Sequence, residues 1–167
     1  DMVLILDSSG SIEDPDGSTD SELDQMKESF MDFVNAFLPD TPTQIAVVEF
    51  DDESRLLQGF TNDEEKITNA IESAVSGGGT NWEAALIEAH EIPDPRPEVP
   101  NLYILASDGM PNRCVGPEED PFWGCGSVTA FDEAVTKANE IKSDGIRILT
   151  LGIGIEPDAV IKMENIS

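Results

Sequence analysis

The sequence predicts a doubly wound α/β domain, with helices on both faces of a mostly parallel sheet. Short, continuous apolar runs recur along the chain, as expected of strands that are buried on both faces. Segments with apolar residues at helical spacing separate most of these runs, and this alternation favours parallel strands. One run is weaker and more polar, which predicts an antiparallel strand at one edge. The length of 167 residues fits one domain.

Five segments have the composition of strands. They are residues 2–6, 44–50, 54–60, 102–106 and 146–151. The first is an unbroken apolar run, Met-Val-Leu-Ile-Leu, which is typical of a strand covered on both faces. The third contains Arg55 and Gln58, so we expect it at an edge of the sheet, where polar side chains reach solvent.

Amphipathic segments between the strands predict five helices. These helices cover residues 23–37, 64–75, 82–89, 131–141 and 157–166. Thr61 and Glu64 form a capping-box pattern before the second helix, and Val75 falls on its apolar face. The glycine run 77–79 ends that helix, and a long loop, 108–128, follows the fourth strand.

The strongest compositional signal is charge. The chain has 35 acidic and 9 basic residues, which gives a formal net charge of −26. This balance argues against nucleic-acid binding and against docking on anionic membranes, because both need clustered Lys and Arg. Cations, polar ligands and proteins remain as partners, and the acidity is expected of a salt-loving or marine source. No run of 18 apolar residues is present, so we expect no membrane insertion.

The two cysteines, Cys114 and Cys125, flank a segment that contains Gly and Pro residues within the long loop. Their spacing is not C-x-x-C, and a cysteine metal site would need more ligands nearby, so they do not predict one. Two interpretations stay open. The pair is either a disulfide that staples a loop of a secreted protein, which we favour, or two free thiols.

Oxygen-bearing side chains follow the first strand directly. Asp7, Ser9 and Ser11 occupy alternate positions of Asp-Ser-Ser-Gly-Ser, where a doubly wound sheet binds ligands beyond the carboxyl ends of its strands. Alternate positions in a tight loop can direct three oxygens to one point. Carboxylate and hydroxyl ligands suit one hard divalent cation, Mg²⁺ or Ca²⁺, with Mn²⁺ also suitable.

Two further loops carry matching oxygens. Thr80 follows the glycine run, and Asp108 follows the fourth strand. Because the strands are mostly parallel, we expect all three loops to converge on one ion at one edge of the sheet. Each residue also has a structural interpretation: Thr80 and Glu83 form a capping-box pattern, and Asp108-Gly109 is a common turn pair.

Together, these residues resemble the von Willebrand factor A domain family, which includes the inserted domain of integrins and has a Rossmann-like fold. The metal ion-dependent adhesion site of that family combines D-x-S-x-S with a threonine on a second loop and an aspartate on a third. Asp7, Ser9 and Ser11 match the first element. Thr80 and Asp108 match the second and third, in the family's order. The resemblance covers most of the chain and implies a complete site.

The resemblance also implies a role for each candidate ligand. Ser9 and Ser11 bind the metal directly, whereas Asp7 acts mostly through water. Thr80 and Asp108 exchange direct and water-mediated contact as the site changes state. The remaining coordination position is left for a ligand, usually a carboxylate.

The implied function is an adhesion or protein-recognition module that binds an acidic group of a partner protein or glycan through its cation. Strand-like residues begin at position 2, so we expect residues 1–167 to be a single, monomeric domain of a larger extracellular or cell-surface protein. The alternative is an intracellular assembly module of the metal-chelatase type, which works with an ATPase partner. The cysteine pair favours the extracellular interpretation.

We do not expect an enzyme. A dehalogenase-type phosphatase needs a second aspartate two positions after its nucleophile, and that position is Ser9 here. A serine hydrolase needs a G-x-S-x-G motif with a histidine partner. The one histidine, His90, lies within a predicted helix and is interpreted as a residue of the helix face.

Two other groups of residues have both a functional and a structural interpretation. Asp14, Asp16 and Asp20 lie in an acidic stretch that is either a solvated loop or a weak second cation site. Phe122 and Trp123 lie between the two cysteines. They either pack down to anchor the loop or form a rim that contacts the ligand.

Overall fold

The computed structural model describes residues 1–12, 21–38, 41–116, 125–154 and 157–167. Five residues to which the sequence assigns a function lie outside these ranges: Asp14, Asp16, Asp20, Phe122 and Trp123. The second cation site and the ligand rim therefore stay predictions.

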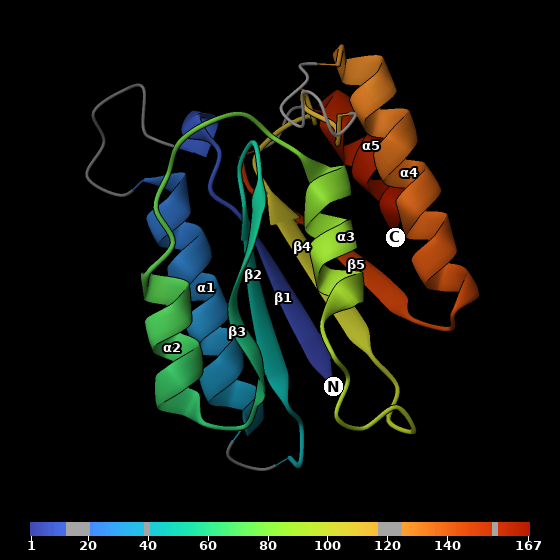
Figure 1. The fold of residues 1–167 in the computed structure, drawn as a ribbon. Coiled ribbons are helices and arrows are strands. Elements are labelled where there is room, and N and C mark those ends of the chain that lie inside the picture. Colours follow the sequence, from blue (N-terminus) through green and yellow to red (C-terminus); the bar gives the residue numbers. More distant parts are fainter. Residues whose placement is uncertain (13–20, 39–40, 117–124, 155–156) are drawn as a thin grey trace.

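Five strands form one sheet in the order β3-β2-β1-β4-β5 (Figure 1). They are β1 (Met2–Asp7), β2 (Ile45–Phe50), β3 (Ser54–Thr61), β4 (Leu102–Ser107) and β5 (Arg147–Gly152). β1 pairs in parallel with β2 and β4, and β4 pairs in parallel with β5. β3 is antiparallel to β2 at one edge. This mixed sheet confirms the predicted fold class, including the polar edge strand.

Helices cover both faces of the sheet (Figure 1). α1 (Glu22–Phe37) and α2 (Glu64–Glu72) pack on one face. α3 (Trp82–Glu91), α4 (Ser127–Ser143) and α5 (Pro157–Ile166) pack on the other. Among the described residues, no helix is long and apolar enough to cross a bilayer.

The position of β1 explains why an unbroken apolar run forms the centre of the sheet. Its side chains alternate between two hydrophobic clusters, with Val3 and Ile5 in the cluster of α3, α4 and α5. Leu4 and Leu6 belong to the cluster of α1 and α2. All four are fully buried, and each burial contributes about 1.5–3 kcal/mol to hydrophobic stabilisation. The strand therefore needs apolar residues at every one of these positions.

The N-cap and the C-terminal end of α2 differ from the sequence-based prediction. Asp63 is the N-cap, because its side chain accepts the Lys66 N–H, whereas Thr61 still belongs to β3. The helix ends before Val75, which is 71% exposed and does not face the core. The carboxylate of Glu49 accepts the Val75 N–H at 2.9 Å. The Val75 N–H thus has its hydrogen-bond partner outside the helix.

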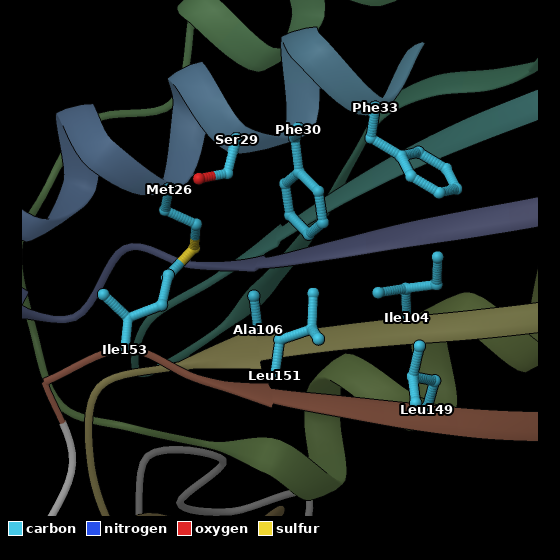
Figure 2. Close-up of a pocket in the computed structure, with 9 residues that line it drawn as sticks. All are labelled: Met26, Ser29, Phe30, Phe33, Ile104, Ala106, Leu149, Leu151 and Ile153. Carbon is cyan, nitrogen blue, oxygen red and sulfur yellow. The ribbon is translucent and has the colours of Figure 1, made fainter. Parts of the chain in front are cut away.

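One part of the sheet is only partly covered. The faces of β4 and β5 beside α1 line an apolar groove of about 220 Å³ (Figure 2). Phe30 and Phe33 of α1 form one side, and Leu149 and Leu151 of β5 form another. The two leucines are 45% and 40% exposed. Apolar side chains of β5 are therefore partly exposed on this face of the sheet.

Candidate metal centre

The candidate residues lie at the edge of the sheet where β1, β2 and β4 end. Asp7 and Ser107 are the last residues of two parallel neighbours, so they lie at the same edge. A short 3₁₀ helix, Gly10–Ile12, follows β1. The Ser8 N–H and hydroxyl both donate to the carbonyl of Phe50, the last residue of β2. This is the edge at which doubly wound sheets bind their ligands.

A chain of polar contacts joins the loops that follow β1 and β4. The hydroxyl oxygens of Ser9 and Ser11 lie 3.1 Å apart. The Ser11 hydroxyl also donates to Asp108 Oδ1 at 3.1 Å. The main-chain N–H of Ser9 donates to Asp7 Oδ1 at 2.8 Å and so fixes the start of the loop. The structure therefore brings four of the five candidate ligands together.

Asp7 is completely buried, and two groups donate to its carboxylate. Besides the Ser9 N–H, the Ser107 hydroxyl donates to Asp7 Oδ2. Ser107 in turn accepts a hydrogen bond from Trp82 Nε1 at 3.1 Å. Burial raises the pKa of Asp7 to about 7, although the hydrogen bonds from Ser107 and Ser9 oppose this rise. Sequence reasoning missed Ser107 and Trp82, because no motif signals a contact between these segments.

Asp108 is only partly buried, at the entrance to the same site. Burial raises the pKa of its carboxyl, and the hydrogen bond from Ser11 opposes that rise. The charge of Asp108 also raises the pKa of Asp7. A fully buried and a partly buried carboxylate thus lie close enough to repel each other, and a positive charge near both is electrostatically favourable.

Thr80 is held at the same edge through its main chain. Its N–H donates to Asn112 Oδ1 at 2.9 Å, and its carbonyl accepts the N–H groups of Asn112 and Arg113. Its loop contacts the loop after β1, since the Gly10 N–H donates to the Gly78 carbonyl at 3.1 Å. Within the described part of the chain, no hydrogen bond joins the Thr80 side chain to the other candidate ligands.

Helix capping does not explain Thr80. Asn81 is the N-cap of α3, because its side chain accepts the Ala84 N–H at 3.0 Å. Glu83 does not complete a capping box either, and its carboxylate accepts the Val115 N–H of the next loop at 2.8 Å. The structural interpretation of Thr80 is therefore wrong.

The glycine run before Thr80 allows a close approach of three segments. Gly78 has a φ of +66°, which favours glycine. A Cβ at Gly79 would lie 2.7 Å from Asn112 Oδ1 and 2.8 Å from Asp52 Oδ1. Gly78 and Gly79 are thus needed for packing at the site, whereas the sequence predicted only the end of a helix at this run.

A family model of the von Willebrand factor type A domain matches residues 2–110. The chain belongs to this family. The matched range contains all five candidate ligands, from Asp7 to Asp108. No curated protein sequence matches this type A domain significantly.

Solved structures share the fold of this type A domain over nearly its whole length. The vWF domain of the type V pili tip protein Mfa5 from Porphyromonas gingivalis has a TM-score of 0.79 at 16% identity, covering 99% of this chain and 85% of that one. Proximal thread matrix protein 1 from the mussel byssus has a TM-score of 0.70 at 24% identity, with coverages of 97% and 38%. The manganese-loaded TRAP protein of Plasmodium vivax has a TM-score of 0.69 at 20% identity, with coverages of 98% and 61%. The chain thus spans less than two thirds of the last two proteins.

A disulfide closes part of the loop after β4 in this type A domain. Cys114 and Cys125 are bonded, with their Cα atoms 6.0 Å apart, which confirms the predicted pair. Both cysteines are buried in a small cluster with Ala130, in the first turn of α4. The bond therefore joins two parts of the loop that contains Asp108, beside the start of this helix.

The edge of the type A domain that carries these residues is acidic. In the sequence of its loops (8–21, 51–53, 73–81 and 108–126), Arg113 is the only basic residue. Arg113 Nε donates to Asp52 Oδ1 at 2.8 Å, so its charge is already paired with a neighbouring carboxylate.

The available donor atoms fit a hard divalent cation. Among the described residues, no group of three or more His, Cys, Asp or Glu side chains is arranged to hold a metal. The candidate centre instead brings together two carboxylates and two serine hydroxyls, all of them oxygen donors. The threonine of the adjoining loop, Thr80, would add a further hydroxyl. Such a set suits Mg²⁺ or Ca²⁺ better than a softer metal. The buried carboxylate of Asp7 also favours a positive ion nearby, because burial disfavours its isolated charge.

Proposed function

We propose that this chain is a metal-dependent adhesion or protein-recognition module. One divalent cation at the candidate centre binds a carboxylate of a partner protein or glycan. The proposal rests on the side-chain contacts that join Ser9 to Ser11 and Ser11 to Asp108. These contacts bring oxygen atoms from two loops to one place. That place lies at the edge where this class of fold binds its ligands.

Five residues would hold the cation: Asp7, Ser9, Ser11, Thr80 and Asp108. The hydroxyl ligands are neutral, so the carboxylates of Asp7 and Asp108 would supply the negative charge of the ligand set. Asp7 is fully buried and its Oδ1 atom accepts the Ser9 N–H, so it would act mostly through water and leave the ion a net positive charge. When bound, the cation supplies the positive charge that attracts a partner's carboxylate. Mg²⁺ and Ca²⁺ are the expected ions, and Mn²⁺ is a suitable probe.

Proteins that share the fold support a role in adhesion. The Mfa5 domain comes from a pili tip protein, and proximal thread matrix protein 1 comes from the mussel byssus. One structure of the mussel protein has zinc in its MIDAS motif, the metal ion-dependent adhesion site, and the TRAP structure is loaded with manganese. Because the structures of these two proteins contain a divalent cation, such a cation is the first ligand to test here.

The disulfide supports an extracellular or cell-surface location. Disulfides persist in oxidising compartments, whereas thiols are kept reduced in the cytosol. The intracellular assembly module of the chelatase type would be expected to have free thiols, but Cys114 and Cys125 are bonded. We therefore favour the extracellular module. We assign no catalytic role to His90, whose Nε2 lies 3.1 Å from Asp144 Oδ2.

Calorimetric titration with Mg²⁺, Ca²⁺ and Mn²⁺ tests the metal centre. The domain should bind one ion, and Ser11→Ala should weaken the binding by about tenfold or more, because a ligand is lost. Ser29→Ala is the matched control, since Ser29 lies on α1 and its hydroxyl donates to the Gln25 carbonyl. Equal affinities for the wild type and Ser11→Ala would contradict the proposed ligand set.

The relaxation of water protons in the Mn²⁺-loaded domain tests the carboxylate step. Acetate that coordinates the ion replaces a metal-bound water and lowers the relaxation enhancement. An enhancement that stays constant as acetate is added would contradict carboxylate binding, even if Mn²⁺ itself binds.

A further inference from the structure

The turn between β2 and β3 lies at the same edge as the candidate metal centre, because β3 runs antiparallel to β2. Asp52 in this turn contacts two other loops. Its Oδ1 atom accepts the Gly79 N–H at 2.9 Å and Arg113 Nε at 2.8 Å. Its main-chain carbonyl accepts Asn81 Nδ2 at 3.0 Å. Asp52 therefore binds both residues that flank Thr80 in the chain.

Thr80 itself is bound by the loop that contains Asp108. Its N–H donates to Asn112 Oδ1 at 2.9 Å, and its carbonyl accepts the Asn112 N–H at the same distance. The packing is close, since a Cβ at Gly79 would lie under 3 Å from both Asn112 Oδ1 and Asp52 Oδ1. Three segments that are distant in the sequence thus meet around one main-chain position.

We infer that Asp52 and Asn112 are positioning residues that fix Thr80 relative to Asp108. Among the candidate ligands, Thr80 is the one contributed by the glycine loop. Its place in the ligand set therefore depends on the groups that bind its main chain. The inference rests on the proposed function for the ion that Thr80 would bind, but the hydrogen bonds can be measured without a metal.

The hydrogen bonds of Asp52 must be separated from its charge. Any carboxylate near the centre attracts a cation, so its removal weakens binding even without a positioning role. Asp51 is the matched control, because it lies in the same turn and has the same charge. Its carboxylate accepts hydrogen bonds from Arg55 Nη2 at 2.7 Å and from the Glu53 N–H at 2.9 Å. Within the described part of the chain, it makes no hydrogen bond to the loop of Thr80.

Calorimetric titration with Mg²⁺ is the first test. Asp52→Ala should raise the Kd for Mg²⁺ by about tenfold, as is typical when a residue that supports metal ligands is lost. Asn112→Ala should have a similar effect, although it removes no charge. Asp51→Ala should raise the Kd by less than about threefold, because it acts through screened charge alone. The melting temperatures of the variants, measured in EDTA, show that each is folded.

Amide hydrogen exchange in EDTA is the second test and needs no metal. Asp52→Ala should speed the exchange of the Gly79 amide, and Asn112→Ala should speed that of the Thr80 amide, each by about tenfold or more. Asp51→Ala should leave both rates unchanged. If Asp52→Ala does not fold, Asn112→Ala still provides both measurements.

The outcomes separate this inference from the proposed function. If the wild type does not bind Mg²⁺, the proposed function fails, and the exchange rates alone decide the positioning role. If the wild type binds Mg²⁺ and both Asp52→Ala and Asn112→Ala match Asp51→Ala in Kd, the positioning role is overturned. Unchanged exchange at Gly79 and Thr80 in these variants would also overturn it.

Discussion

Trp82 Nε1 donates a hydrogen bond to the Ser107 hydroxyl at 3.1 Å, and this contact joins the start of α3 to the end of β4. Both side chains are fully buried. An indole N–H can only donate, so the Ser107 oxygen accepts from Trp82. An ionised carboxylate can only accept, so the Ser107 hydroxyl donates to Asp7. A residue of the hydrophobic core is thus linked through one hydroxyl to a carboxylate of the candidate metal centre.

The Ser107 contact predicts a loss of stability when the hydroxyl is removed. Ser107→Ala takes one donor from the buried Asp7 carboxylate and should lower the free energy of unfolding by about 1–3 kcal/mol. Urea unfolding at pH 8 in EDTA measures this without a contribution from metal. Ser143→Ala is the control, because Ser143 is exposed at the end of α4 and should change stability by less than about 0.5 kcal/mol. Equal effects of the two substitutions would contradict the role of Ser107.

The close approach at Gly79 predicts different effects for neighbouring glycines. Gly79→Ala places a Cβ under 3 Å from Asn112 and Asp52, so it should destabilise the domain by about 1–3 kcal/mol. It should also weaken Mg²⁺ binding. Gly77→Ala should be neutral or slightly stabilising, because no atom lies within 4 Å of its Cβ position. Thermal unfolding and calorimetry compare the two variants, and a neutral Gly79→Ala would show that the loop adjusts freely.

The disulfide predicts an effect of moderate size on stability. Removing the Cys114–Cys125 bond opens a ring of about 12 residues, which should lower the free energy of unfolding by about 2–3 kcal/mol in the chain-entropy model. Urea unfolding of the double Cys→Ser variant measures this loss. Mass spectrometry of the non-reduced protein after alkylation should find no modified thiol. Two alkylated cysteines in protein isolated without reductant would contradict the bond.

The net charge of −26 predicts that salt stabilises the fold. Like charges on the folded chain repel one another, and added ions screen this repulsion. The melting temperature should therefore rise between low salt and 1 M NaCl with the divalent cation held at saturation. Saturation separates general screening from specific metal binding. A melting temperature that does not change over this range would count against self-repulsion as a destabilising factor.

The strands could be predicted because the pattern of apolar and polar residues in each one reflects how that strand is buried in the sheet. Val3 and Leu4 belong to opposite clusters, so a strand between two helical layers needs apolar side chains on both faces. Helix ends were harder to predict. Thr61 and Asp63 are both good N-caps, and the choice between them depends on how far β3 continues along β2. That length is set by strand pairing and not by the local sequence.

The candidate site could be predicted only in part. The residues after β1 follow a buried strand directly, and the topology alone places them at the ligand-binding edge. Asp52 and Ser107 also come shortly after predicted strands, but the sequence does not indicate which residues their side chains contact. Asp52 accepts a hydrogen bond from Gly79, which is 27 positions away in the sequence. Ser107 donates one to Asp7, which is 100 positions away. Contacts of this kind depend on the assembled sheet, so no local pattern encodes them.

The loops at the candidate centre contain a single base, Arg113, and no lysine. All five lysines of the chain lie on helices. They are Lys27, Lys66, Lys137, Lys142 and Lys162. Lysine-directed coupling therefore attaches the domain to a sensor chip through its helices. Lys27 differs from the others in one respect, because its Nζ atom donates to the Ala74 carbonyl at 2.6 Å and so lies against the loop that leads to Thr80. Coupling at Lys27 would attach the chip beside that loop, so a screen for ligands in the presence and absence of divalent ions should use a Lys27→Arg variant.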